Sequence, residues 1–243
     1  MRNILVVAVI SACVTLAACT KEDIRRSVEQ VRSEIERSGG GSELTVGEIA
    51  SGLKEALRVG SAKVSTDLGK QDAYANDPDI HIPLPQKLQD VKSALGRVGL
   101  GSVMDSLELK LNRAAERAAP EAKAVFWNAI SEMTLQDVMD IYDGPDDAAT
   151  RYFENRMRDE LVRRFEPIIS DAMLEVGAIR AYDEAMKNYQ ALPFVPDVKT
   201  DITNHVVDES LDGLFFYLAK EEAAIRNDPV ARTTELLRRV FGR

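Results

Sequence analysis

The stretch of sequence that decides the fold runs from Thr45 to Leu57 and reads TVGEIASGLKEAL. Thr45 and Glu48 have the spacing of a capping box, in which each side chain binds a backbone N–H of the other residue at a helix start. Apolar residues then recur at helical steps, which places them on one face of an α-helix. They are Ile49, Leu53, Ala56, Leu57 and Val64. The segment therefore predicts an amphipathic helix that ends near Gly69.

Similar patterns follow along the chain, separated by stretches rich in proline, glycine or aspartate. Helices are predicted at residues 86–98, 102–132 with a kink or a second start at Pro120, 134–142, 147–176 interrupted by Pro167, 178–191, 204–227 and 230–241. Prolines exclude regular helix at 76–85 and predict extended chain at 192–196, and a short hairpin between 80–84 and 194–198 stays open as an alternative. The predicted fold class is all-α, a single irregular bundle of about seven to nine helices.

The amino terminus has the organisation of a secretory signal, with one positive charge at Arg2 and an apolar run from Ile4 to Ala18. The run is shorter than the roughly 20 apolar residues that span a bilayer as a helix. It ends in Leu16-Ala17-Ala18-Cys19, which resembles the lipobox of bacterial lipoprotein precursors. The resemblance implies removal of residues 1–18 and acylation of Cys19. The alternative is an ordinary signal peptide cut near Ala18.

Cysteine use agrees with export. Cys13 leaves with the signal and Cys19 carries lipid, so the mature chain has no free thiol for disulfides, redox chemistry or cysteine metal sites. Thr20 follows the lipidated cysteine. By the enteric sorting rule, an aspartate at this position would imply retention in the inner membrane. The expected location is therefore the outer membrane, facing the periplasm.

Residues 19–43 are expected to form a lipidated tether. Ile24, Val28, Val31 and Ile35 follow the spacing of a short coiled coil, and the glycines from Gly39 to Gly41 form a flexible joint. The segment at 21–37 is interpreted as a semi-rigid spacer, with weak self-association or packing on the domain as alternatives. The helical domain is expected to span residues 44–243.

The charge of the mature chain excludes several partners. It carries 30 basic and 40 acidic side chains once Arg2 is removed, a net charge of −10. This balance repels phosphate backbones and disfavours nucleic acid. It also disfavours adsorption to anionic lipid, so contact with the membrane is expected from the anchor.

Several phrases of the sequence carry a family resemblance. They are GLKEAL at 52–57, IPLP at 82–85, NRAAE at 112–116, ALPFV at 191–195, LDGLF at 211–215, IRNDP at 225–229 and RTT at 232–234. In this order they resemble the exported bacterial family known as domain of unknown function 4197, over about residues 44–243. The resemblance implies an exported, mostly helical single domain. It brings no assigned activity, so no catalytic residue is transferred.

No catalytic motif in the sequence is complete. Ser51 and Lys54 match the SxxK of penicillin-binding proteins, but no Ser-Asp-Asn follows, and Lys199-Thr200-Asp201 lacks the glycine of Lys-Thr-Gly. His81 and His205 have no metal-ligand spacing, which favours structural or surface roles.

Acidic residues form no recognisable metal site either. The turns at 76–79 and 143–147 lack the spacing of an EF-hand loop, and helix capping explains them more simply. Glu154, Glu221 and Glu222 lack the ExxH of a di-iron site and are interpreted as parts of solvated faces. No catalytic residue, metal or cofactor is therefore predicted.

A set of polar residues within the family phrases is the candidate site. Its members are Asn112, Arg113, Arg151, Tyr152, Asp212, Arg226, Asp228 and Arg232. One interpretation is a network of paired charges that fixes helix packing. The other is an arginine-lined pocket for an anionic or amphipathic envelope ligand.

The expected function is non-enzymatic: a cell-envelope lipoprotein that acts through a protein partner or an assembly. One alternative is a module that binds an envelope ligand in a helical pocket, which requires a cavity of several hundred Å³. The other is an uncharacterised hydrolase, which requires carboxyl groups of raised pKa in one cleft.

Overall fold

The computed structural model describes residues 44–242, except for the side chain of Met157. The predicted signal peptide, Cys19 and the tether at 19–43 lie outside the described residues. Within these bounds the chain forms nine α-helices, two 3-10 helices and no strand. The predicted all-α fold and its range of helix number are therefore confirmed.

The helices follow one another with short connections, apart from residues 69–85 and 191–201. They are α2 (Val46–Leu68), α3 (Gln86–Gly96), α4 (Gly101–Ala118), α5 (Ala122–Glu132), α6 (Leu135–Tyr142), α7 (Ala148–Glu175), α8 (Ala178–Gln190), α9 (Ile202–Asn227) and α10 (Glu235–Phe241), with 3-10 turns η1 (Ala119–Glu121) and η2 (Pro229–Ala231). None of these described helices has both the length and the apolar character needed to cross a membrane.

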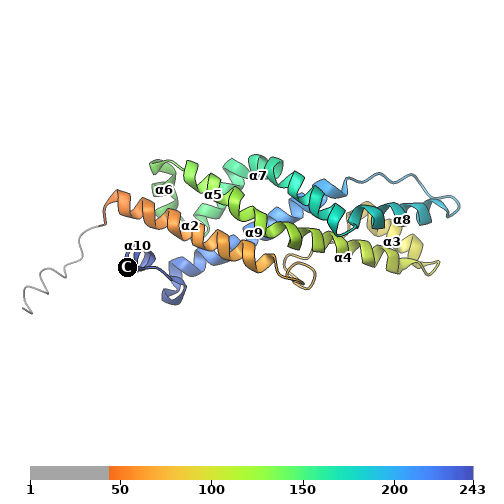
Figure 1. Ribbon diagram of the computed structural model, residues 1–243, viewed down its shortest axis with the longest axis horizontal. Helices are drawn as coiled ribbons and strands as arrows, with labels where there is room; N and C mark the ends of the chain where they lie inside the picture. Colours follow the sequence, from red (N-terminus) through yellow and green to blue (C-terminus); the bar gives the residue numbers. More distant parts are fainter. Residues whose placement is uncertain (1–43, 243) are drawn as a thin grey trace, which may run out of the picture. The chain divides into compact units, whose positions relative to one another are not determined.

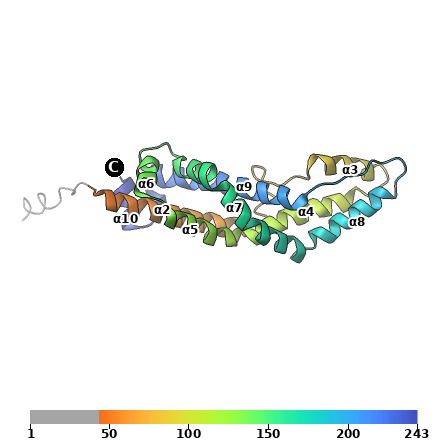
Figure 2. The same cartoon turned by 90° about the horizontal axis from the view of Figure 1, so that it is seen from above.

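The long helices α2, α4, α7 and α9 form the centre of the bundle, and the shorter helices pack around them (Figure 1). Figures 1 and 2 both place α3 and α8 at one end, and α6, α10 and the start of α2 at the other. The α3–α4 and α8–α9 connections therefore share the α3–α8 end. One continuous core includes Leu107 and Leu111 of α4 together with Phe153 and Phe165 of α7.

Local sequence signals predict several helix ends correctly. In the capping box of α2, the Glu48 N–H donates to Thr45 Oγ1 (3.2 Å) and the Thr45 N–H donates to Glu48 Oε2 (2.9 Å). Thr134 and Asp137 form a second capping box at the start of α6, and α2 ends at Gly69. At Pro120 the second of the two predicted alternatives holds, because η1 separates α4 from a new helix.

Pro167 does not interrupt α7, and that prediction is wrong. The helix runs through it from Ala148 to Glu175, although proline removes one backbone donor and crowds the preceding turn. Leu161, Phe165 and Ile169 are buried in the core on both sides of the proline. Burial of these side chains outweighs the local penalty.

Three further expectations differ from the structure. Residues 192–196 are not extended throughout, because the chain turns at 191–194 and Phe194 has a left-handed φ of 60°. The proposed hairpin is absent from the described residues, where 80–84 pack into the helical core instead. The helix expected at 230–241 is divided, because Thr234 caps α10 by accepting from the Leu237 N–H (3.2 Å).

A close approach at Gly213 gives a direct test of the packing between α9 and the segment before α3. A Cβ added at Gly213 would lie 2.7 Å from Cε1 of the fully buried Tyr74. Overpacking of this kind costs about 1–3 kcal/mol, partly offset by the gain of about 1 kcal/mol for alanine over glycine in a helix. We expect Gly213→Ala to lower the free energy of unfolding by up to about 2 kcal/mol, measured by urea denaturation.

Gly47→Ala is the matched control for this substitution. It also replaces a helical glycine, but its nearest atom outside the local helix backbone, Thr45 Oγ1, would lie 4.0 Å away. The control should leave the free energy of unfolding unchanged or raise it by up to about 1 kcal/mol. Equal effects of the two substitutions would show that Tyr74 does not pack on α9 in this way.

Candidate functional site

The eight predicted polar residues lie on three helices and in the connection that follows α9. Asn112 and Arg113 lie on α4, Arg151 and Tyr152 on the first turns of α7, Asp212 in the middle of α9, and Arg226, Asp228 and Arg232 around the end of α9. Their polar contacts run mostly to different partners, so the single network or pocket expected from the sequence is not formed. Arg226 and Arg232 do meet, since Nη2 of Arg232 donates to the Arg226 carbonyl oxygen (2.8 Å).

Asn112 holds a non-helical segment, residues 72–84, which we call the strap. The Asn112 side chain is fully buried. Its Oδ1 accepts from the Ile82 N–H (2.9 Å), and its Nδ2 donates to the carbonyl oxygens of Ile82 (2.8 Å) and Glu108 (2.9 Å). Buried backbone groups outside helices and sheets need such partners. Asn112 therefore replaces the pairing that a neighbouring strand would supply to Ile82.

One turn further along α4, Glu116 binds the start of the strap. Its Oε1 accepts from the N–H groups of Tyr74 and Ala75, both at 3.2 Å. Arg113 pairs with both Glu116 and Asp72, with N–O distances of 2.6 Å. Arg113 therefore acts here as the counterion of a buried carboxylate.

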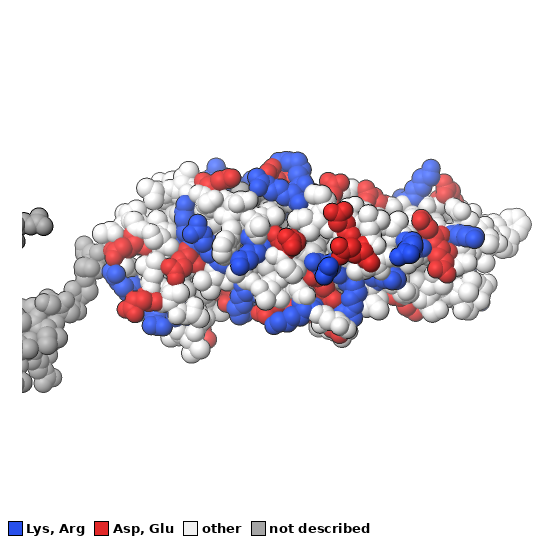
Figure 3. Space-filling model, viewed as in Figure 1, with Lys and Arg blue, Asp and Glu red and all other residues white. Residues whose placement is uncertain are grey.

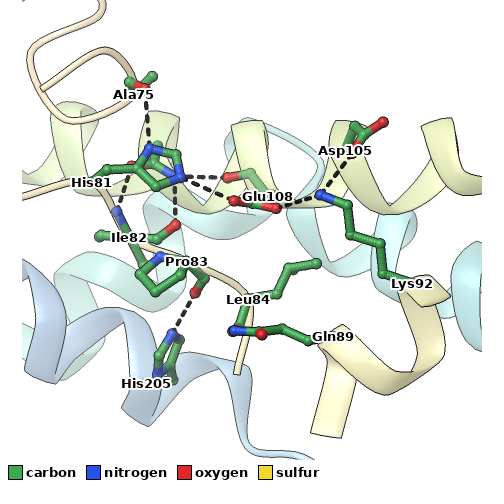
Figure 4. A network of polar contacts seen from close by, with 11 residues as sticks. Ala75, His81, Ile82, Pro83, Leu84, Gln89, Lys92, Asp105, Glu108 and His205 are labelled. Carbon is green, nitrogen blue, oxygen red and sulfur yellow. Dashed lines mark hydrogen bonds and ion pairs between the residues drawn. The ribbon is translucent and has the colours of Figure 1, made fainter. Parts of the chain in front are cut away.

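One turn in the other direction, Glu108 contacts His81 of the strap (Figure 4). The two ring nitrogens of His81 face Oε1 of Glu108 and the carbonyl oxygen of Ala75, both at 3.0 Å. Burial raises the pKa of Glu108, but hydrogen bonds from His81 and Lys92 outweigh it and leave this pKa below its ordinary value.

Helix α9 binds the opposite side of the strap. The Tyr74 hydroxyl donates to the Ser210 carbonyl oxygen (2.8 Å), and Nε2 of His205 donates to the carbonyl oxygen of Pro83 (2.7 Å; Figure 4). Tyr217 donates to the Asp77 carboxylate, which raises the pKa of Tyr217 to about 12. These contacts give both histidines structural partners.

A second buried group, Glu222 of α9, caps helix α7. Its carboxylate accepts from the N–H groups of Ala149 (2.9 Å) and Thr150 (3.0 Å) and from the Thr150 hydroxyl (3.0 Å). The acidic turn at 143–147 is predicted to cap this helix, but the side chain of its N-cap residue, Asp147, makes no capping bond and pairs with Arg151 (2.8 Å) instead. The interpretation of Glu222 as part of a solvated face is therefore wrong, since the residue is only 6% exposed.

Arg226 completes this buried pair. Its Nη2 lies 2.9 Å from Glu222 Oε1 and donates to the carbonyl oxygen of Ile141 (2.8 Å), and its Nη1 donates to that of Tyr142 (3.3 Å). These carbonyls end α6, where a helix favours cations. Glu222 and Arg226 together thus join the end of α6 to the start of α7.

The remaining predicted residues make separate contacts with one or two neighbours each. Asp228 caps η2 by accepting from the Val230 N–H (2.8 Å), and Asp212 pairs with Arg158 (2.7 Å). Burial and the neighbouring Asp137 carboxylate raise the pKa of the Tyr152 hydroxyl.

Two open grooves meet along one side of α4. The first has a volume of about 400 Å³ and includes Ser102, Lys110 and Arg180 in its lining. The second has a volume of about 500 Å³ and includes Leu109 and Arg113. They share Ser106, Lys110 and Val176. In contrast, a mainly apolar pocket beside Phe241, between α2 and α9, holds only about 10 Å³.

Exposed apolar side chains lie in both connections at the α3–α8 end. Val98 and Leu100 in the α3–α4 connection are 53% and 39% exposed, and Phe194 in the α8–α9 connection is fully exposed. We call these three residues the apolar tip. Figure 3 shows an uncharged surface at the outermost part of this end, whereas acidic and basic side chains alternate over the rest of that face.

Sequence reasoning missed Glu108, Glu116 and the burial of Glu222. The first two carry a readable signal, because Glu108, Asn112 and Glu116 follow at steps of four on one face of α4. Glu222 stands four residues before Arg226, which is typical of an ion pair on a helix. That spacing alone does not distinguish a buried pair from a solvated one.

Comparison with known proteins gives a family but no described relative. A family model described as a protein of unknown function, DUF4197, matches residues 43–242. No curated protein and no solved structure matches the chain.

Proposed function

Since the chain belongs to the DUF4197 family of proteins of unknown function, we propose that it is a cell-envelope lipoprotein that binds a protein partner through the apolar tip, without catalysis. The proposed anchor is lipid on Cys19, at the outer membrane and facing the periplasm. The proposed tether at residues 20–43 has a reach of at most about 80 Å. A partner within that distance of the membrane is accessible to the domain.

Phe194 is the observation that carries this proposal. The side chain is fully exposed and stands between Pro193 and Pro196, and its φ of 60° is rare for a residue other than glycine. Strained backbone of this kind costs about 1–3 kcal/mol and clusters at functional sites. Aromatic side chains are also frequent among the residues that dominate binding energy at protein interfaces. A loop that presents an aromatic ring to solvent suits a partner with an apolar pocket.

The geometry favours this function over the two alternatives. A lipid enclosed by the bundle needs several hundred Å³ of apolar space. The pocket beside Phe241 offers about 10 Å³, whereas the spaces of about 400–500 Å³ are grooves open to solvent. A carboxylate hydrolase needs raised pKa values in one cleft. The shifted carboxyl groups of the described domain all have lowered pKa values, because hydrogen bonds and neighbouring cations outweigh burial. They are Glu48, Asp67, Asp77, Glu108, Asp137 and Glu160.

Affinity purification of the full-length chain from detergent-solubilised envelopes tests the proposal. We expect Phe194→Ala to reduce the recovery of a specific protein at least tenfold, because truncating a central aromatic anchor costs about 2 kcal/mol or more. Recovery is measured by quantitative mass spectrometry. Phe194 is exposed, so circular dichroism should show an unchanged fold.

Val230→Ala is the control, since Val230 is 85% exposed and lies in the connection before α10, at the other end of the bundle. It should recover the same protein as the unmodified chain. The proposal fails if the unmodified chain recovers no specific protein, or if Phe194→Ala and Val230→Ala recover the same set.

A further inference from the structure

A groove between α4 and the α7–α8 turn brings two cations together without a carboxylate partner. We call it the basic groove and define it by Ser102, Ser106, Lys110, Gly177 and Arg180, which line about 400 Å³ of open space. Neither Lys110 nor Arg180 forms an ion pair within the described domain, although Glu184 also lines the groove. The other two cations of this part of α4, Arg113 and Arg117, do have carboxylate partners.

The two cations converge on one point above Gly177. A Cβ at that position would lie 3.6 Å from Nη2 of Arg180 and 3.7 Å from Nζ of Lys110. The two charged groups are therefore within about 7 Å of each other. One tetrahedral anion can bridge this gap, since charge-assisted hydrogen bonds are about 2.8 Å long. Gly177 leaves that space open, and its φ of 73° disfavours any residue with a side chain.

Neighbouring groups supply further donors to the same space. Ser102 and Ser106 precede Lys110 at steps of four on α4, so all three residues share a helix face. Nζ of Lys110 donates one hydrogen bond to the Val176 carbonyl oxygen (2.8 Å), which fixes its position and leaves two donors. Glu184 also lines the groove and opposes an anion, which restricts the site to the part nearest Gly177.

We propose that the basic groove binds a phosphate group, carried either by a small soluble ester or by a lipid headgroup. Two converging cations repel each other unless an anion lies between them, and guanidinium and ammonium groups are the usual side-chain ligands of phosphate. The second groove, which shares Ser106, Lys110 and Val176, adds the exposed Leu109 as an apolar wall. This site is independent of the partner proposed for the apolar tip.

Calorimetric titration of the purified full-length chain in detergent, in phosphate-free buffer, tests this site. The probes are inorganic phosphate, glycerol phosphate, a short-chain phosphatidic acid and, as an uncharged control, the matching diacylglycerol. We expect Arg180→Gln and Lys110→Gln each to weaken phosphate binding at least tenfold. Glu184→Gln should strengthen it severalfold, a gain that a purely structural role of these residues does not predict.

The matched control is Lys187→Gln, which removes an exposed cation of the same helix outside the groove. The affinity of Lys187→Gln for inorganic phosphate should stay within twofold of that of the unmodified chain. The same holds for Phe194→Ala. Tighter binding of phosphatidic acid than of glycerol phosphate identifies a lipid headgroup, and equal binding identifies a soluble ester. The proposal is overturned if no phosphate probe binds, or if Arg180→Gln and Lys187→Gln bind equally well.

Discussion

Replacing Glu222 by alanine is expected to lower the free energy of unfolding by about 3–5 kcal/mol, the range for breaking a buried ion pair by removal of one partner. The substitution leaves Arg226 buried without its carboxylate. It also removes the acceptor of the Ala149 and Thr150 N–H groups, which start α7. Urea denaturation followed by circular dichroism measures the change.

Two further variants separate the origins of this effect. Glu160→Ala removes a glutamate of α7 that pairs with Arg163 and Arg164 in an exposed position. Exposed pairs of this kind contribute little to stability. Glu222→Gln keeps an acceptor oxygen but removes the charge. Its loss in the free energy of unfolding should therefore fall between those of Glu222→Ala and Glu160→Ala. If Glu222→Ala is no more destabilising than Glu160→Ala, the carboxylate does not join α6, α7 and α9.

Asn112→Leu is expected to destabilise the domain by about 3 kcal/mol, since each buried polar group left without a partner costs about 1–3 kcal/mol. Leucine has a similar volume but leaves the N–H and the carbonyl oxygen of Ile82 unpaired. The strap should then detach before the helices unfold. Hydrogen exchange should show faster exchange of the Ile82 amide and of the Tyr74 and Ala75 amides, which Glu116 binds.

Asn128→Leu provides the control on an exposed face of α5. It should change the free energy of unfolding by no more than about 0.5 kcal/mol and leave exchange in the strap unaltered. Unchanged protection of Ile82 in Asn112→Leu would mean that another group satisfies its backbone, against the hydrogen bonds described here.

Much of the fold was predictable because the signals are local. Thr45 with Glu48 and Thr134 with Asp137 start helices through contacts three residues apart, and Gly69 ends α2 within its own turn. Prolines predicted correctly that 76–85 is not helical. The continuation of α7 through Pro167 was not predictable in this way, because it depends on core packing by residues distant in sequence.

The candidate site was less predictable because its contacts are long-range. Asn112 and Arg226 were singled out from the sequence, and both proved to be buried or half-buried polar residues with several partners. Asn112 binds Ile82, and Arg226 binds Glu222 and the end of α6. Helix packing, rather than spacing along the chain, brings Asn112 to Ile82 and Arg226 to α6. The exposure of Phe194 depends on a turn that prolines alone predicted to be extended chain.

Both proposals place recognition on the surface of the bundle, whereas the buried polar residues maintain its architecture. The strap and the Glu222–Arg226 pair fix α4, α6, α7 and α9 relative to one another. The α8–α9 connection lies at the α3–α8 end of the domain, apart from these buried contacts.

Photocrosslinking in intact cells tests the central claim, that a protein partner binds the apolar tip. The full-length chain carries a photoreactive p-benzoylphenylalanine at position 194 or, in a second strain, at the exposed position 230. We predict a discrete crosslinked species of higher mass from position 194 and none from position 230. No crosslinked protein from position 194, or the same products from both positions, would contradict the account.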